Sequence, residues 1–292
     1  QKIISAIGWV MFKVMRISGI ESLVAAGNIF CGQTEAPLLI RPYIKDMSNS
    51  ALMCMMTTGM ATVAGGVLAA YVGLGISAGH LICASFMAAP AAIVISKIMY
   101  PDTASSKTDK NTSSLQIQVN KEINILAAAC KGASEGVMLA INVAAMLIAF
   151  IALIELINVI IIKVSTIFGM QLTFQQIIGL IFYPIALMIG IDWNDAFTVG
   201  QLIGEKTVIN EFYAFIHLAE LIKTAQISER SASLATYALC GFANFSSIAI
   251  QIGGIGSLEP QRKKDFAKLG LKAMIGGTIA SLLNTTIAGL LM

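Results

Sequence analysis

Two glutamates, Glu35 and Glu211, lie in polar stretches of a sequence that is otherwise strongly apolar. Glu35 belongs to the segment 27–37, which glycines and a proline bracket, and Glu211 directly follows Asn210. A bare charge at membrane depth costs at least ~2.5 kcal/mol, so each carboxylate needs polar partners. The amides and hydroxyls nearby can donate and accept in several directions, and no arginine stands with them. This chemistry suits a neutral, polyhydroxylated solute better than an anion.

Hard oxygen donors accompany the first glutamate. The Asn28 amide, the Thr62 hydroxyl and the backbone carbonyls near Cys31 and Val63 have the chemistry of a small-cation site. The ends of half-helices and the carbonyls of unwound backbone commonly hold Na⁺ in transporters. A proton that titrates one of the two glutamates is the alternative coupling ion.

Other kinds of chemistry have little support in the sequence. The two histidines are far apart, and neither a nucleophile-elbow pattern nor a phosphate-binding loop is present. The five cysteines are scattered without metal-like spacing, so we expect reduced packing residues and no cofactor. The net charge of +3 is too small and too dispersed for nucleic acid. We therefore expect a protein that is not an enzyme.

The composition predicts an all-α polytopic membrane protein. Of the 292 residues, 57% are hydrophobic and 12% are charged, whereas a soluble domain carries about 25% charged residues. The mean hydropathy is +0.80. Apolar stretches near the ~20 residues that a bilayer requires predict the spans 51–75, 76–100, 135–162 and 269–291. A fifth predicted span, 232–252, is polar in its middle.

The two glutamate segments predict helical hairpins that re-enter the membrane. Each hairpin, 21–40 and 195–218, has limbs too short to cross a bilayer and a polar tip, although an ordinary loop is the alternative at the first. The order of hairpin, interrupted span and plain span occurs at 21–100 and again at 195–291. Interrupted segments at corresponding places in two halves indicate a transporter site between repeats.

The remaining segments complete the predicted organisation. It comprises an interfacial helix (1–20), a first repeat (21–134) with a cytoplasmic loop (101–131), the span 135–162 and a shorter apolar segment (173–190) within 135–190, and a second repeat (191–292). Arginines and lysines concentrate around 41–50, 101–131 and 257–268, which places these connections in the cytoplasm. The hairpins then enter from opposite sides, so the repeat is inverted.

Three segments, 27–37, 207–212 and 238–244, resemble the concentrative nucleoside transporter family, and the resemblance extends in order over nearly the whole chain. It implies a homotrimer in a lipid bilayer that works by elevator-type alternating access. Each subunit would have a scaffold domain and a mobile transport domain. The family carries further spanning helices before residue 1, so the chain resembles a truncated member that lacks part of the scaffold.

The resemblance also implies site residues. The nucleobase would face Gly32, Gln33, Thr34, Glu35 and Val67, and the ribose hydroxyls would contact Glu211, Asn244 and Ser247. Sodium would be coordinated by Asn28, Thr62 and the carbonyls of Cys31 and Val63. Position 31 is usually aliphatic in the family, so cysteine there is a departure. The resemblance also makes 135–162 the scaffold helix at the trimer contact and 173–190 an interfacial helix.

The expected function is cation-coupled import of nucleosides across the plasma membrane, with Na⁺ as the coupling ion. Proton-coupled symport, a membrane-embedded enzyme and a non-transporting fragment are the alternatives. The choice between purine and pyrimidine nucleosides stays open, and we expect Thr62, Val63 and Gln33 to set it.

Overall fold

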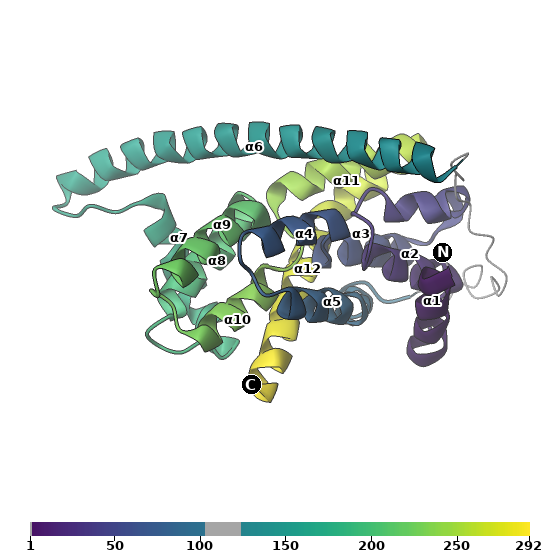
Figure 1. Cartoon of the computed structure of the whole chain (residues 1–292), viewed down its shortest axis with the longest axis horizontal. Coiled ribbons are helices and arrows are strands. Elements are labelled where there is room, and N and C mark those ends of the chain that lie inside the picture. Colours follow the sequence, from purple (N-terminus) through teal and green to yellow (C-terminus); the bar gives the residue numbers. More distant parts are fainter. Residues whose placement is uncertain (1, 103–123) are drawn as a thin grey trace.

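The computed structural model describes residues 2–102 and 124–292, and within them every regular element is a helix (Figure 1). The α-helices of the first half are α1 (Lys2–Met15), α2 (Gly19–Asn28), α3 (Asn49–Ala61), α4 (Gly65–Gly73) and α5 (Ala78–Met99), with the 3₁₀ helix η1 (Ala36–Asp46) between α2 and α3. The long helix α6 (Ile125–Ile167) follows. The later helices are α7 (Phe174–Met188), α8 (Ala196–Val208), α9 (Glu211–Lys223), α10 (Glu229–Leu239), α11 (Phe245–Leu258), η3 (Pro260–Arg262) and α12 (Lys263–Leu291).

Two of the predicted spans are broken helices. The span predicted at 51–75 consists of α3 and α4 with non-helical backbone at 62–64, and the span predicted at 232–252 consists of α10 and α11 with a break at 240–244. At the second break, Asn244 caps the new helix by accepting a hydrogen bond from the Ser247 amide at 2.8 Å. The prediction that both of these spans are interrupted is confirmed.

Three stretches of the described residues are long and apolar enough to cross a membrane, namely Asn49–Gly73, Ala78–Met99 and Pro260–Leu291. They correspond to the predicted spans 51–75, 76–100 and 269–291. Most of the predicted loop 101–131 lies outside the described residues. The predicted end of this loop at residue 131 is wrong, because helix α6 already begins at Ile125. Asn124 caps this helix by accepting a hydrogen bond from the Ala127 amide at 2.7 Å. The helix therefore begins before the predicted position 135 and continues beyond 162.

The helices α2 and η1 pack together as a first hairpin, and α8 and α9 pack together as a second. The first hairpin is longer than predicted, since η1 continues to Asp46. Most of the polar stretch 205–211 of the predicted second hairpin is helical, because α8 continues to Val208 and α9 begins at Glu211. Glu205 and Lys206 lie inside α8 and are each 1% exposed. Glu205 pairs with the half-buried ring of His217 at 2.9 Å, and Lys206 donates to the buried Ala238 carbonyl at 2.8 Å. Their polarity therefore does not interrupt the helix, and the tip is reduced to residues 209 and 210.

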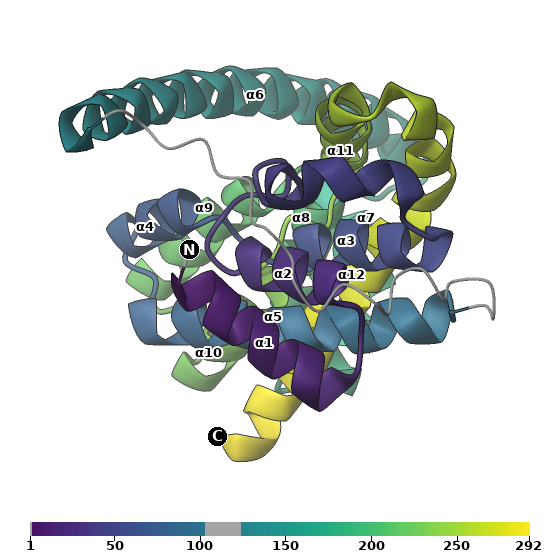
Figure 2. The same ribbon diagram turned by 90° about the vertical axis from the view of Figure 1, so that its right-hand side faces the viewer.

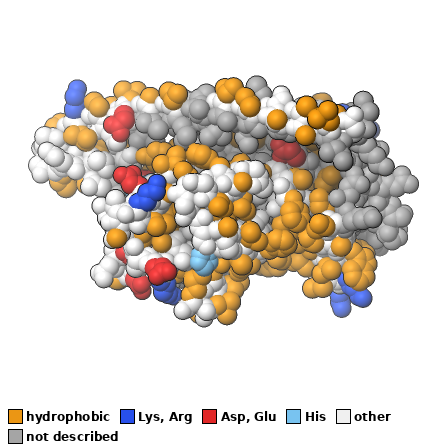
Figure 3. Space-filling model, in the orientation of Figure 1, with side chains coloured by type: hydrophobic (Ala, Val, Ile, Leu, Met, Phe, Trp, Pro, Cys, Tyr) orange, Lys and Arg blue, Asp and Glu red, His pale blue; other side chains and the backbone are white. Residues whose placement is uncertain are grey.

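Helix α12 runs through the middle of the bundle and packs against α3, α5, α10 and α11. Helix α6 lies along one side of the bundle in both Figure 1 and Figure 2. Hydrophobic side chains cover much of the face drawn in Figure 3, and charged side chains on it are few. Large apolar side chains such as Leu156 of α6 and Ile98 of α5 are exposed, which fits a surface that contacts lipid or another subunit.

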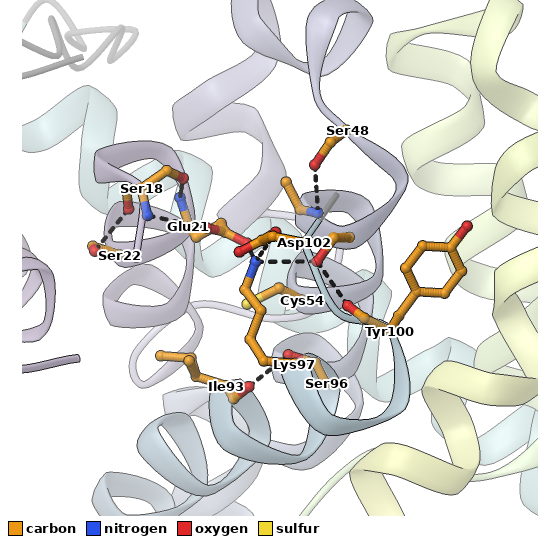
Figure 4. Close-up of polar contacts among 12 residues, drawn as sticks. Ser18, Glu21, Ser22, Ser48, Cys54, Ile93, Ser96, Lys97, Tyr100 and Asp102 are labelled. Atoms are coloured by element: carbon orange, nitrogen blue, oxygen red, sulfur yellow. Dashed lines mark hydrogen bonds and ion pairs between the residues drawn. The ribbon is translucent and has the colours of Figure 1, made fainter. Parts of the chain in front are cut away.

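An ion pair joins the start of the first hairpin to the end of α5 (Figure 4). The Lys97 ammonium lies 2.6 Å from the Glu21 carboxylate and 2.7 Å from that of Asp102. The Lys97 ammonium also donates to the hydroxyl of Ser50 at 3.1 Å. Glu21 completes a capping box with Ser18 at the first turn of α2. One lysine therefore holds α2, α3 and α5 together.

The two helix breaks meet in space. Gly241, in the second break, has φ +136°, a backbone conformation that favours glycine. A Cβ atom at this position would lie 2.7 Å from the carbonyl oxygen of Ala61, at the end of α3. Only glycine allows the backbones of the two broken helices to approach this closely.

The order of elements in the first half returns in the second half. In each half one helix packs on a hairpin, α1 on α2 and α7 on α8, and a broken helix and a long helix follow. The long helix is α5 in the first half and α12 in the second. This correspondence extends the predicted repeat by the helix that precedes each hairpin.

Candidate functional site

A cavity of about 240 Å³ lies where the tips of both hairpins meet the broken helices. Small-ligand pockets commonly have volumes of about 300–1,000 Å³, so this cavity suits a small solute. It is lined by Gly32, Gln33, Thr34, Glu35, Ala64, Val67, Asn210, Glu211, Phe212, Phe242, Asn244, Ser246, Ser247 and Ile250. All the residues to which the sequence analysis gave a substrate contact line this one cavity.

Glu211 is held rigidly at the tip of the second hairpin. One carboxylate oxygen accepts from the Asn244 amide at 2.8 Å, and the other accepts from the Tyr71 hydroxyl at 3.3 Å. Glu211 is 7% exposed and Tyr71 is fully buried. Since the Asn244 oxygen already caps α11, the orientation of this amide is fixed, and Glu211 is presented to the cavity with its remaining acceptor capacity free.

Gln33 is the most strongly bonded cavity residue of the first hairpin. Its side-chain nitrogen donates to the hydroxyl of Ser247 at 3.0 Å, and its oxygen accepts from Gln251 at 3.1 Å. Gln251 also donates to the carbonyl of Met56 at 3.1 Å and is fully buried. These bonds join the first hairpin to α11 of the other half.

Glu35 is the exposed carboxylate of the site, and its side chain accepts from the Thr34 hydroxyl at 3.1 Å. Gly32 lies directly beneath it, and a Cβ atom at position 32 would clash with the Glu35 carboxylate. The absence of a side chain at Gly32 thus lets the carboxylate fold over the hairpin tip. Glu35 and Glu211 line the same cavity from different hairpins, as the sequence analysis expected.

The predicted cation ligands lie where the first tip meets the first break. The Gly65 amide donates to the Phe30 carbonyl at 3.1 Å and ties the two segments together. Asn28 donates to the Thr58 hydroxyl at 3.1 Å, but its buried side-chain oxygen has no hydrogen-bond partner in the described part of the chain. The Thr62 hydroxyl donates to the Thr58 carbonyl at 2.8 Å and keeps its lone pairs.

The backbone completes this donor set. Over the described residues, the carbonyls of Cys31 and Val63 accept no backbone hydrogen bond. An orphaned amide oxygen, a hydroxyl and two free carbonyls are neutral hard donors, which is the chemistry that Na⁺ requires. The residues present therefore fit a small monovalent cation.

Sequence reasoning missed several residues that support the site. Tyr71, Gln251 and Lys206 were not singled out, although each is a buried polar side chain inside an apolar helix. Their polarity in apolar surroundings was the available signal, but their partners lie far away in the sequence. Phe242 and Asn210, which also line the cavity, lie inside the segments 238–244 and 207–212 but were given no substrate contact.

Comparison with known proteins gives consistent matches. The family described as "Na+ dependent nucleoside transporter C-terminus" matches residues 80–289, and the one described as "Nucleoside recognition" matches residues 1–78. An uncharacterized transporter of Haemophilus influenzae is 48% identical over 99% of this chain and 70% of its own length. Sodium/nucleoside cotransporter 1 of Rattus norvegicus is 43% identical over the whole chain, which spans 47% of that protein.

The solved structures give the same result. A structure of CNTnw in an inward-facing substrate-bound state is 44% identical and superposes with a TM-score of 0.91 over 99% of this chain and 68% of that one. A variant of CNTnw in an outward-facing state has a TM-score of 0.94. The chain thus spans about 70% of the Haemophilus influenzae transporter and of the CNTnw variant, and under half of the Rattus norvegicus relative.

Proposed function

The chain belongs to the Na⁺-dependent nucleoside transporter family, and from this premise we propose that it imports nucleosides by symport with Na⁺. The observation that carries the proposal is the single cavity lined by both hairpin tips and both broken helices. Its carboxylates, amides and hydroxyls match the hydroxyls of a ribose and the polar edge of a nucleobase.

The side chains divide between the two parts of a nucleoside. Glu211, Asn244 and Ser247 form one continuous hydrogen-bonded group, which suits the vicinal hydroxyls of a ribose. The polar residues of the first hairpin, with Val67 opposite, suit the flat base. Asn28, Thr62 and the carbonyls of Cys31 and Val63 would hold the Na⁺.

Coupling follows from this neighbourhood. Residues 31–35 of the first tip include both a sodium carbonyl and substrate contacts, so an ion that orders the tip also orders the substrate site. Moving one positive charge inward gains ~2.3 kcal/mol per 100 mV of membrane potential, about a fortyfold accumulation. The four sodium donors are not titratable at neutral pH, which favours Na⁺ over a proton at this position.

The membrane arrangement belongs to the same proposal. We propose that both hairpins lie at membrane depth in the plasma membrane. The first enters from the cytoplasm and the second from the opposite side, so that the two halves form an inverted repeat. The hairpins and broken helices would move together as an elevator against a trimeric scaffold that includes α6. The repeated order of elements and the exposed apolar side chains of α6 support this arrangement.

Uptake by the full-length protein tests the proposal. Labelled uridine and adenosine are offered to vesicles with an inward Na⁺ gradient or an equal choline gradient, each at several external pH values. We expect uptake that requires Na⁺ and changes little with pH. Uptake that follows the proton gradient in choline would instead assign the coupling to a glutamate, and the absence of uptake under all conditions would refute nucleoside transport.

A further inference from the structure

Lys206 is a fully buried lysine that the proposed site leaves unexplained. It lies in the last turns of α8, is 1% exposed and does not line the cavity. A buried ammonium is costly in an apolar interior, so its neighbours have to compensate for the lost water.

Those neighbours are mainly neutral oxygens. The ammonium donates to the carbonyl of Ala238 at 2.8 Å and to the hydroxyl of Ser281 at 3.4 Å. Ser281 in turn donates to the carbonyl of Cys240 at 3.0 Å. Glu211 interacts electrostatically with Lys206, but no carboxylate lies within ion-pair distance of the ammonium in the described part of the chain. The lysine is therefore held by oxygens, as a coordinated cation would be.

The location explains why oxygens are available. Ala238 is in the last turn of α10, where the chain leaves the helix at the second break, so no later amide of this helix reaches its carbonyl. The carbonyl end of a helix also attracts positive charge. Lys206 thus caps the helix that ends at the break.

The first break has the same parts with a different occupant. There, too, the last turn of a hairpin limb lies beside the end of a broken helix: Asn28 ends α2, and Thr62 follows the last residue of α3. The groups at this break are neutral donors, and the Asn28 oxygen has no partner in the described residues. The second break has a lysine where the first has an amide whose side-chain oxygen lacks a partner among the described residues.

We propose that Lys206 is a tethered cation that holds the second helix break as Na⁺ holds the first. Only the first break then exchanges an ion with solution, while the second is permanently occupied. The comparison with Na⁺ rests on the proposed function, whereas the role of the Lys206 charge rests on its own contacts. Lys206 is a positioning residue, since it orders the break whose Asn244 holds Glu211.

Chemical rescue tests the inference in the full-length protein. Lys206→Ala removes the atoms of one propylammonium ion, and Lys206→Met keeps the chain length but not the charge. We expect both variants to lower the thermal unfolding midpoint in detergent and to reduce nucleoside uptake by about tenfold or more. n-Propylammonium should raise the midpoint and the uptake of Lys206→Ala, whereas 1-propanol, which has the same shape without charge, should not. Lys206→Arg should keep sodium-dependent uptake.

The possible results separate the two proposals. Equal rescue by 1-propanol, no rescue by propylammonium, or wild-type uptake and sodium dependence in Lys206→Met would each overturn the tethered cation. If the wild type transports no nucleoside, the proposed function fails, but the thermal midpoints still report on Lys206. If the alanine variant cannot be purified, uptake by the methionine and arginine variants in membranes decides, because they differ in charge at similar length.

Discussion

At the scale of single residues, the proposed site uses side chains that spend part of their hydrogen-bonding capacity on the structure and would offer the rest to a ligand. Asn244 uses its oxygen to cap α11 and its nitrogen to hold Glu211. Gln33 is bonded at both ends of its amide. Such side chains cannot turn to suit another ligand, so a solute that lacks a matching hydroxyl leaves a buried group unpaired at a cost of about 1–3 kcal/mol.

Glu211→Gln tests the strongest of these contacts. Hydrogen bonds to a charged group are worth ~1.5–3 kcal/mol, so we expect the Kd for uridine to rise by about thirtyfold. Tyr71→Phe removes one donor to Glu211 while the ring can still stack on Phe215, whose centroid is 4.1 Å away, and should raise the Kd only about fivefold. Calorimetric titration of both variants gives the comparison. Unchanged affinity in Glu211→Gln would remove Glu211 from the ribose site.

At the scale of elements, the close contact between the two breaks sets how the halves assemble. Gly241→Ala adds a Cβ atom against the Ala61 carbonyl in a backbone conformation with positive φ. We expect a loss of stability of about 2–3 kcal/mol, seen as a lower thermal unfolding midpoint. The matched control is Gly253→Ala in α11, where an added Cβ meets nothing within 4 Å, and this change should be neutral or slightly stabilising. Equal thermal unfolding midpoints for the two variants would contradict the close contact between the two helix breaks.

The ion pair at the entrance of the first hairpin has its own test. Lys97→Met leaves Glu21, which is 2% exposed, without its cation, and should destabilise the protein by about 3 kcal/mol. The double variant Glu21→Gln/Lys97→Met should recover much of this loss, because no unpaired charge stays buried. Thermal unfolding of the wild type, both single variants and the double variant yields the coupling energy. A coupling energy near zero would mean that Glu21 and Lys97 do not stabilise each other, and that Asp102 and water satisfy the Lys97 ammonium.

The elements also explain which features could be predicted from sequence. Glycines, prolines and polar residues inside apolar stretches locate the breaks and the first tip, because local backbone chemistry determines them. The same signal is misleading at Lys206, because a charge in an apolar segment suggests the end of a helix, whereas this lysine lies within α8. Its actual partner, the Ala238 carbonyl, becomes available only through the break of another helix. Partners that folding brings together from distant segments, as with Gln251 and Gln33, have no local signal.

At the scale of the whole molecule, the two halves hold each other's hairpins. The first hairpin reaches α11 of the second half through Gln33 and Ser247, and the second hairpin reaches α4 of the first half through Glu211 and Tyr71. The cavity lies between these reciprocal contacts. We call these reciprocal contacts, Gln33 with Ser247 and Glu211 with Tyr71, the clamp. An ion that orders the first tip should therefore stabilise the clamp, and a nucleoside that contacts both tips should stabilise it further.

Cys31 is a natural reporter of this tightening, because its half-buried thiol lies at the first tip while its carbonyl is a proposed sodium ligand. In a Cys83→Ser/Cys130→Ser background, which removes the exposed thiols, we expect Na⁺ to slow maleimide labelling of Cys31 and uridine to slow it further. The buried Cys54 and Cys240 should label slowly throughout.

Thr62→Val should weaken the effect of Na⁺ on the labelling of Cys31, since one oxygen ligand is lost while the side-chain volume is kept. Labelling that ignores Na⁺ but responds to uridine would place the coupling ion away from this tip, and the order of protection thus tests whether the ion closes the clamp before the substrate does.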